Sequence, residues 1–446
     1  MNSSRKPGAR QAWAWTLAAV WLLAGRAAAE IQILTQVPST YMFPAEGFMP
    51  FNVHRGTQTL LSLMLPGTLF DDPQGMACAL LNKTRDAQTP LNDVIVTVLG
   101  VNSGAGQIFY NVGLKDLKKY GTPGSGEGQF QNPTGVAIHP NGAVAVADTG
   151  NNRIVLLRDD GLKLRWDKVA AGSFRAPQGV AYDTPGNLYI ADTGNNQIKV
   201  RNPSGVIRVL PIPGLDHPTA LCVIDAKAEW SFYKTDPYGN RLAVIDRQGA
   251  RLQTFTLAGS PLAQFTSDQL PDGPMQLGGC AFDYYGNLVA TDTAAGCLRK
   301  FGRNLEYLVT FGSPGQGDYQ FDQPRGICLN TEFGQMFVSE RESADYYWIG
   351  ADALNLAFQR TAKGFRFPFF LTERALVSAQ IKDAQGNVVK DLGDRQDLEE
   401  GAQELDWTPD PGLAAGTYSL QMTVMATYST REREAKQLTL SLSYAP

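Results

Sequence analysis

Acidic residues recur at one position of an internal repeat. Asp148, Asp192 and Asp236 follow one another at intervals of 44 residues, and Asp292 and Glu340 occupy the matching place in weaker copies. A ring of carboxylates could hold a cation or a sugar, but Ca²⁺ requires about six to eight convergent oxygens. A Thr-Gly-Asn-Asn turn accompanies the acid in the two clearest copies. We therefore interpret these acids as structural caps that accept backbone N–H groups of the following turn.

Histidines could supply a catalytic metal site, because three imidazoles suit a catalytic zinc. The chain has three, His54, His139 and His217, but their places in the repeat differ. His139 lies in a turn, His217 precedes an apolar strand, and His54 comes before the repeats. The nucleophile motif G-x-S-x-G and the phosphate loop are also missing. We predict no catalytic residues, no metal and no cofactor, although a Ser-His-Asp site assembled from distant residues stays open.

The repeat predicts the fold. Residues 128–161 and 172–205 share the pattern F-x-x-P-x-G-V-A, a Gly turn, an apolar run and A-D-T-G-N-N-x-I. Weaker copies begin at Asp72, His217, Leu277 and Gln323. Each copy has four short apolar runs separated by Gly, Asn, Asp or Pro, which is typical of antiparallel strands. Four strands about every 45 residues form one propeller blade. The six copies therefore predict an all-β fold, a six-bladed β-propeller followed by a small Ig-like β-sandwich.

The two clearest copies resemble the NHL-repeat family, within the six-bladed propellers called TolB-like. The motifs that carry the resemblance are P-T-G-V-A…V-A-D-T-G-N-N-R-I and P-Q-G-V-A…I-A-D-T-G-N-N-Q-I, and the resemblance extends over residues 57–360. The family includes binding platforms for protein and nucleic acid, and also lyases and hydrolases. Membership would therefore imply a propeller without naming an activity.

The two ends of the repeat region predict the domain limits. Residues 57–65 are expected to be the outermost strand of the last blade, so that the propeller occupies residues 30–362. Residues 363–446 show strand-like alternation, a D-A-Q-G-N turn and an L-A-A-G-T-Y segment. This part resembles the FlgD-type Ig-like domain, with Trp407 expected in its core.

One residue in each copy is expected to face the mouth of the central channel. It stands between the anchor Pro, or its equivalent, and the Gly that begins the first strand. These residues are Gln74, Thr134, Gln178, Thr219, Gly278 and Arg325. A polar ring with one cation could hold a small anionic or carbonyl ligand. The alternative is that these side chains only hydrate the end of the channel.

The N-terminus resembles a secretory signal peptide over residues 1–29. Three basic residues precede the apolar run from Ala12 to Gly25, and Ala27 to Ala29 offer a cleavage site after Ala29. As a helix the run would span about 21 Å, too short for a ~30 Å hydrocarbon core. We therefore expect a secreted or periplasmic protein with no membrane span in the mature chain.

The net charge of the chain limits which partners it is expected to bind. The net charge is −4, and cleavage would remove basic residues only. An acidic chain without a basic run disfavours nucleic acid as a partner.

The five cysteines, Cys78, Cys222, Cys280, Cys297 and Cys328, form no C-x-x-C motif, and four lie in apolar strands. We predict that they are buried free thiols rather than disulfides.

These observations favour a scaffold that binds a protein or glycan partner over an enzyme. The alternative is a propeller lyase or hydrolase with its active site at the channel mouth.

Overall fold

The computed structural model describes residues 36–38, 55–82, 95–112, 116–270, 273–317, 319–428 and 435–445. The expected signal peptide, residues 1–29, lies outside the described residues. Within the described ranges, no helix combines the length and apolar character that a membrane crossing requires.

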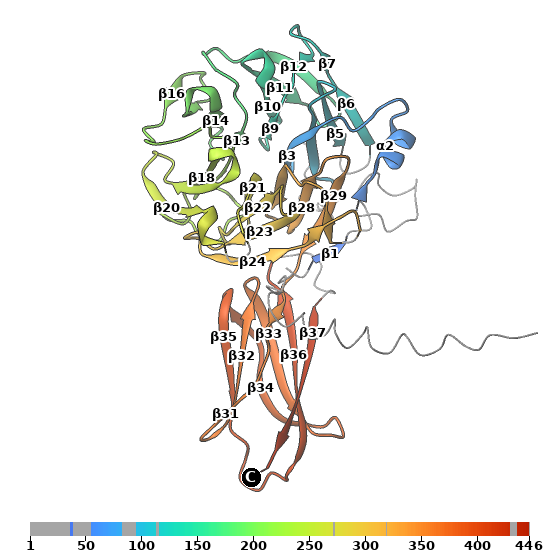
Figure 1. Cartoon of the computed structure of the whole chain (residues 1–446), viewed down its shortest axis with the longest axis vertical. Coiled ribbons are helices and arrows are strands. Elements are labelled where there is room, and N and C mark those ends of the chain that lie inside the picture. Colours follow the sequence, from blue (N-terminus) through green and yellow to red (C-terminus); the bar gives the residue numbers. More distant parts are fainter. Residues whose placement is uncertain are drawn as a thin grey trace, which may run out of the picture. The chain divides into compact units, whose positions relative to one another are not determined.

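Six antiparallel sheets follow one another along the chain (Figure 1). The first consists of β3 (Pro73–Ala79), β4 (Thr97–Asn102), β5 (Gln107–Val112) and β6 (Asp116–Tyr120). The second consists of β9 (Gly135–Ile138), β10 (Ala143–Asp148), β11 (Arg153–Asp159) and β12 (Leu164–Val169). The third consists of β13 (Val180–Tyr182), β14 (Leu188–Asp192), β15 (Gln197–Arg201) and β16 (Ile207–Val209). The next two consist of β17 (Ala220–Ile224), β18 (Arg241–Asp246), β19 (Arg251–Phe255) and β20 (Pro261–Thr266); and β21 (Leu277–Phe282), β22 (Leu288–Asp292), β23 (Cys297–Phe301) and β24 (Tyr307–Phe311). The sixth contains β27 (Ile327–Asn330), β28 (Gln335–Ser339) and β29 (Ala344–Ile349), with β1 (Gln36–Pro38) and β2 (Arg55–Gly56) paired to β29.

Short elements connect these sheets. Parallel pairs join β7 (Thr122–Pro123) to β8 (Gln129–Phe130) and β25 (Ser313–Pro314) to β26 (Gln320–Phe321). Single 3₁₀ turns are η2 (Thr149–Asn151), η3 (Thr193–Asn195), η4 (Arg247–Gly249) and η5 (Ser267–Gln269).

The sheets close into a ring, as a propeller requires. The innermost strands contact one another in the order β3, β9, β13, β17, β21, β27 and back to β3. Each sheet is covered on both faces by its neighbours, so central strands such as β14 are buried along their whole length. The strands converge so closely that a Cβ atom on Gly135 would lie 2.1 Å from the carbonyl oxygen of Gln178. The Gly at this repeat position therefore allows the inner strands to meet.

The N-terminal segment pairs with the last sheet, but through other residues than predicted. Residues 57–65 form helix α2 (Gln58–Met64) instead of a strand. Thr57 caps the helix through its hydroxyl, which accepts a hydrogen bond from the Leu60 N–H at 3.4 Å. After its capping Thr, the segment is mostly Leu, Gln and Met, with Thr59 its one β-branched residue, so its composition suits a helix. The outer strands of the last sheet are β1 and β2, which lie upstream.

Arg55 fastens this upstream segment to the last sheet. Its guanidinium contacts Glu340, lies 3.8 Å from Asp345 and donates to Ser343 Oγ at 3.1 Å. Both carboxylates are fully buried. Burial raises the pKa of Glu340 and of Asp345, while Arg55 acts in the opposite direction. A single cation thus compensates two buried acids.

Residues after the ring form a β-sandwich of two sheets. One contains β30 (Ala353–Leu354), β31 (Gln359–Thr361), β32 (Gly364–Leu371) and β35 (Gly401–Trp407); the other contains β33 (Ala375–Lys382), β34 (Val388–Leu398), β36 (Gly416–Ala426) and β37 (Lys436–Tyr444). Burial alternates residue by residue in β32 and β33, so each strand turns one face to the core. Trp407 lies in this core, as the sequence predicts, with its ring stacked on Phe365 at 5.4 Å. β30 and β31 precede residue 362, the predicted boundary, and pair with β32 of the sandwich.

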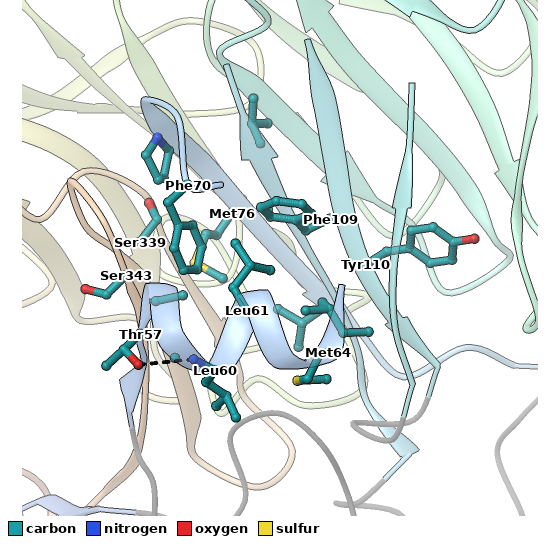
Figure 2. A pocket seen from close by; sticks show the side chains of 17 residues that line it. Thr57, Leu60, Leu61, Met64, Phe70, Met76, Phe109, Tyr110, Ser339 and Ser343 are labelled. Atoms are coloured by element: carbon teal, nitrogen blue, oxygen red, sulfur yellow. Dashed lines mark hydrogen bonds between the residues drawn. The ribbon is translucent and has the colours of Figure 1, made fainter. Parts of the chain in front are cut away.

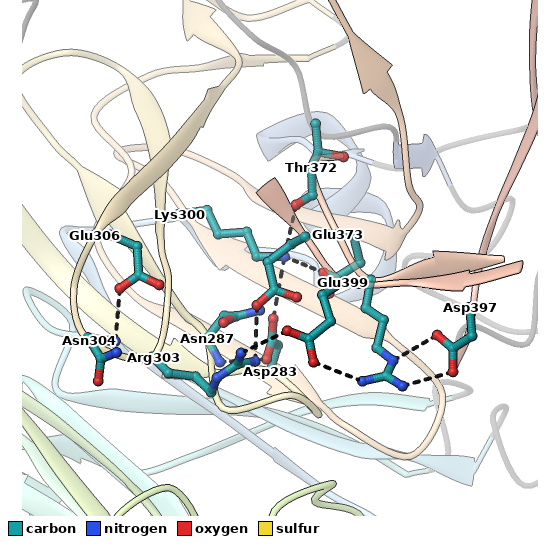
Figure 3. A network of polar contacts seen from close by, with 12 residues as sticks. Asp283, Asn287, Lys300, Arg303, Asn304, Glu306, Thr372, Glu373, Asp397 and Glu399 are labelled. Carbon is teal, nitrogen blue, oxygen red and sulfur yellow. Dashed lines mark hydrogen bonds and ion pairs between the residues drawn. The ribbon is translucent and has the colours of Figure 1, made fainter. Parts of the chain in front are cut away.

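A buried charge cluster joins the propeller to the sandwich (Figure 3). Lys300 on β23 contacts Glu373, which lies between β32 and β33, and its Nζ is 3.4 Å from Asp283. The three side chains are at most 1% exposed. Burial raises the pKa of Glu373 to about 8, although Lys300 acts to lower it. Arg303 adds an ion pair to Glu400 at 3.0 Å.

Candidate functional site

One mouth of the central channel is a cavity of about 450 Å³. All six residues that the repeat places at the mouth line it: Gln74, Thr134, Gln178, Thr219, Gly278 and Arg325. Each stands immediately before the residue at which neighbouring inner strands touch. The Gly75 N–H, for example, donates to the carbonyl oxygen of Thr134 at 2.8 Å, across the boundary between two sheets. The repeat therefore places one residue from each sheet at the same cavity.

Glutamine amides dominate the polar lining. Gln74 and Gln178 were expected, whereas Gln248 on η4 and Gln276 before β21 also line the cavity. None of these four amides makes a hydrogen bond within the part of the chain that the structure describes. Repeat alignment missed Gln248 because it comes from the turn after a second strand rather than from the anchor position. Four free amides offer both N–H donors and C=O acceptors to a ligand.

The one cation of the predicted ring is already paired. Arg325 forms an ion pair with Asp72 and donates to the carbonyl oxygen of Pro73 at 3.2 Å. Its partner lies at the other end of the repeat region and becomes a neighbour only through ring closure. The Thr134 hydroxyl likewise has a partner, the hydroxyl of Thr149 at 2.7 Å. The mouth is thus a largely neutral surface, which argues against the predicted preference for an anionic ligand.

An apolar girdle lies at the inner end of this cavity. It contains one residue from each inner strand, Met76, Val136, Val180, Leu221, Cys280 and Ile327, and these residues also line a second cavity of about 260 Å³. The second cavity is bordered by Trp230, which is 38% exposed and stands on the long connection between β17 and β18. Tyr182 lines it as well, and burial raises the pKa of this phenol to about 12. The channel therefore has a polar cup and a more aromatic cup separated by the girdle.

Asp148 and Asp192 are buried and structural, but they do not accept backbone N–H groups of the following turn as expected. Asp148 accepts a hydrogen bond from the Gln131 N–H at 2.7 Å and pairs with Arg153 at 2.7 Å. Asp192 accepts from the Arg175 N–H at 2.7 Å and pairs with Lys199 at 2.6 Å. Neither carboxylate caps the 3₁₀ turn that follows it. Each instead fastens the loop that enters its own sheet, so the predicted partner was wrong.

In the other sheets too, a polar side chain at this repeat position accepts a hydrogen bond from the loop that enters the sheet. Asp292 accepts from the Gln276 N–H at 3.2 Å and also, as predicted, from the Ala295 N–H of the following turn at 3.1 Å. Glu340 accepts from the backbone of Asp322. In the first sheet Asn102 takes this place and accepts from the Asp71 N–H at 2.7 Å.

Asp236 does not belong to this set. It is exposed in the connection between β17 and β18, which is longer than the corresponding turn between β9 and β10. The extra residues displace the strand end, so the 44-residue interval to Asp236 is a coincidence. Asp246 holds the position, accepting from the Asp216 N–H at 3.0 Å and pairing with Arg251 at 2.7 Å.

The histidines are engaged separately. His139 Nε2 lies 3.0 Å from the Thr184 carbonyl oxygen, and His217 Nδ1 lies 2.6 Å from an Asp216 oxygen. His54 lies outside the described residues. Among the described residues, no group of three or more His, Cys, Asp and Glu could hold a metal ion.

A further hollow beneath helix α2 is small and apolar (Figure 2). Its volume is about 40 Å³, and Leu61, Met64, Phe70 and Phe109 are among the residues that line it. This space has room for at most a water or two, and most of the side chains that line it are apolar. Its small size makes it a poor ligand site.

Residues 130–155 and 174–200 match the model of the NHL repeat. No curated protein sequence matches the chain. A virginiamycin B lyase from Staphylococcus aureus is similar in structure, with 18% identity, a TM-score of 0.41, and coverage of 57% of this chain and 77% of that one.

Two other solved structures are similar over comparable lengths. A nidogen/laminin complex shows 18% identity and a TM-score of 0.41, covering 58% of this chain and 84% of that one. A gluconolactonase from Xanthomonas campestris shows 14% identity and a TM-score of 0.45, covering 71% of this chain and 100% of that one.

Proposed function

We propose that this chain is an exported scaffold whose polar channel mouth binds the neutral end of a glycan. Its fold would be a six-bladed, TolB-like propeller of NHL repeats followed by a FlgD-type Ig-like domain. The observation that carries the binding proposal is the set of four free amides, Gln74, Gln178, Gln248 and Gln276, around a cavity of about 450 Å³.

Amide groups pair well with sugar hydroxyls, since each amide donates through nitrogen and accepts through oxygen, and each hydroxyl can do both. The pairing of Arg325 with Asp72 leaves little net charge at the mouth. A neutral ligand therefore loses no ionic hydration on binding, whereas an isolated charge would be desolvated without compensation.

The sandwich has a supporting role in this proposal. The Lys300 cluster fixes it to the fifth sheet of the propeller, so the two parts would move together. The D-A-Q-G-N turn supports the FlgD-type assignment, because Asp383 accepts hydrogen bonds from the Asn387 backbone at 2.8 Å and side chain at 3.0 Å. Export is supported by the N-terminal sequence features.

A lyase or hydrolase would need a general acid or base near the reacting atoms. The residues that line the polar mouth include no carboxylate, imidazole or lysine. The geometry of this cavity thus provides no observation that favours the enzymatic alternative.

A panel of neutral oligosaccharides and uncharged peptides, measured by calorimetry, tests the proposal. The double variant Gln74→Ala/Gln178→Ala should weaken glycan binding about tenfold, because each net hydrogen bond contributes about 0.5–1.5 kcal/mol. Gln385→Ala is the matched control, since this glutamine is exposed on a hairpin of the sandwich. Equal affinity in both variants, binding of peptides only, or turnover of the bound ligand would refute the proposal.

A further inference from the structure

Four of the five cysteines line one cavity. Cys78 on β3, Cys222 on β17, Cys280 on β21 and Cys328 on β27 all border the second channel cavity. They lie on innermost strands, whereas Cys297 lies on β23, the third strand of its sheet. None of the five forms a disulfide in the structure. The placement of the four thiols in one accessible space raises the question of whether they react with one another.

The four thiols meet in two pairs. The side chain of Cys222 interacts with that of Cys280, and the side chain of Cys328 interacts with that of Cys78. Each pair joins neighbouring innermost strands that are in contact, β17 with β21 and β27 with β3. Disulfide bonds require such close approach of two backbones.

Each pair also has an accessible and a protected member. Cys78 and Cys222 are partly exposed, while Cys328 and Cys280 are buried. This arrangement matches what thiol–disulfide exchange requires, namely a first thiol that an oxidant can reach and a second thiol that resolves the mixed disulfide.

We propose that the two pairs oxidise to inter-sheet disulfides, Cys78–Cys328 and Cys222–Cys280, when the chain meets a disulfide oxidant. A small or protein disulfide would supply the oxidising equivalents, and the proposed export would bring the chain to a compartment that contains them. The thiol chemistry itself does not depend on glycan binding.

The reaction proceeds in two balanced exchanges, shown here for the first pair. The Cys78 thiolate attacks the oxidant R–S–S–R, forms a Cys78–S–S–R mixed disulfide and releases one thiolate, which takes up the proton that Cys78 lost. The Cys328 thiolate then attacks the Cys78 sulfur and releases the second R–S⁻, which is protonated in turn. The protein loses two electrons and two protons, and the oxidant becomes two thiols.

The Cys78–Cys328 bond would lie across the closure of the ring. It would join the first inner strand to the last, at the same boundary where β2 and Arg55 fasten the N-terminal segment. Burial raises the pKa of Cys222 and of Cys328, which lowers their thiolate fractions. Oxidation of the folded chain should therefore be slow and should accelerate as the pH rises.

Thiol counting on the full chain tests the proposal. The reduced, denatured protein is refolded in a glutathione redox buffer, so that access to the folded channel does not limit the reaction. It is then denatured and alkylated. We expect one alkylated cysteine, Cys297, and an intact mass about 4 Da below that of the reduced protein before alkylation, because each disulfide removes two hydrogens. Peptide mapping should show the two stated pairs.

Single variants separate the pairs. Cys78→Ser should leave Cys328 and Cys297 alkylated, and Cys222→Ser should leave Cys280 and Cys297 alkylated. The control Cys297→Ser should leave none. Five alkylated cysteines in the wild-type chain, other pairings, or disulfides between chains would overturn the proposal. Loss of glycan binding with the predicted thiol count would refute only the proposed function.

Discussion

Replacing Lys300 with Met should destabilise the junction between propeller and sandwich. The substitution removes a cation that is 1% exposed and lies between Asp283 and Glu373, while Met preserves most of the side-chain volume. Breaking a buried ion pair by removing one partner costs about 3–5 kcal/mol, because the remaining charge is left uncompensated. For a chain of this length, such a loss corresponds to a Tm about 5 °C lower.

The stability lost in Lys300→Met should depend on pH, because the buried Glu373 carboxyl titrates. Burial raises the pKa of Glu373 from an ordinary value near 4.5 to about 8. An acid that binds its proton more tightly in the folded state makes stability fall as pH rises from the unfolded value toward the folded one. Without Lys300, the pKa of Glu373 rises further. Both proteins should therefore lose stability in parallel between about pH 5 and pH 7. The variant should fall further behind only from about pH 8 upward, where Glu373 ionises in the wild type but stays protonated in the variant.

Chemical denaturation of both proteins at about pH 6 and about pH 9.5 measures this difference. Lys436→Met is the matched control, because Lys436 pairs with Asp352 at 3.2 Å but is 42% exposed. A surface pair of this kind contributes about 1 kcal/mol or less. If Lys300→Met costs no more than Lys436→Met at about pH 6, or if its cost does not grow between about pH 6 and about pH 9.5, the reasoning about buried charge is wrong.

Two further substitutions test how the ring closes. Arg55→Met should lower the free energy of unfolding by about 3–5 kcal/mol, because it leaves the buried Glu340 and Asp345 carboxylates without a cation. Arg360→Met, an exposed control, should change it by about 0.5 kcal/mol or less. Equal effects in denaturation experiments would contradict the fastening role of Arg55. Gly135→Ala should lower stability by about 1–3 kcal/mol through overpacking. Gly100→Ala has open space for its Cβ and serves as control; similar Tm values for both would contradict the close approach of the inner strands.

The ring and its polar mouth could be predicted because the information is local and repeated. The anchor pattern before each inner strand recurs, so Thr134 and Gln178 locate the mouth even without coordinates. Symmetry then carries the assignment to degraded copies such as the one that contains Gly278. The residues that line the cavity therefore agree with the prediction.

The errors arise where the structure departs from the repeat or depends on distant contacts. Asp236 was assigned by interval alone, and an inserted connection moved the equivalent position to Asp246. Residues 57–65 precede the first anchor as the fourth strands of other copies precede theirs, which predicts a strand there, although the closing strands lie upstream. The pairing of Arg325 with Asp72 depends on ring closure, which brings together residues far apart in the sequence. No local sequence pattern predicts such a contact.

The apolar girdle affects whether water and solutes can pass along the propeller axis. Met76, Val136, Val180, Leu221, Cys280 and Ile327 contribute one side chain per sheet at the level where the two cups meet. Hydrophobic constrictions exclude water and hydrated solutes by dewetting. A sugar or ion that enters the polar cup would have to shed its hydration to go further. Any path along the propeller axis therefore crosses an apolar ring, which disfavours the passage of hydrated solutes from one cup to the other.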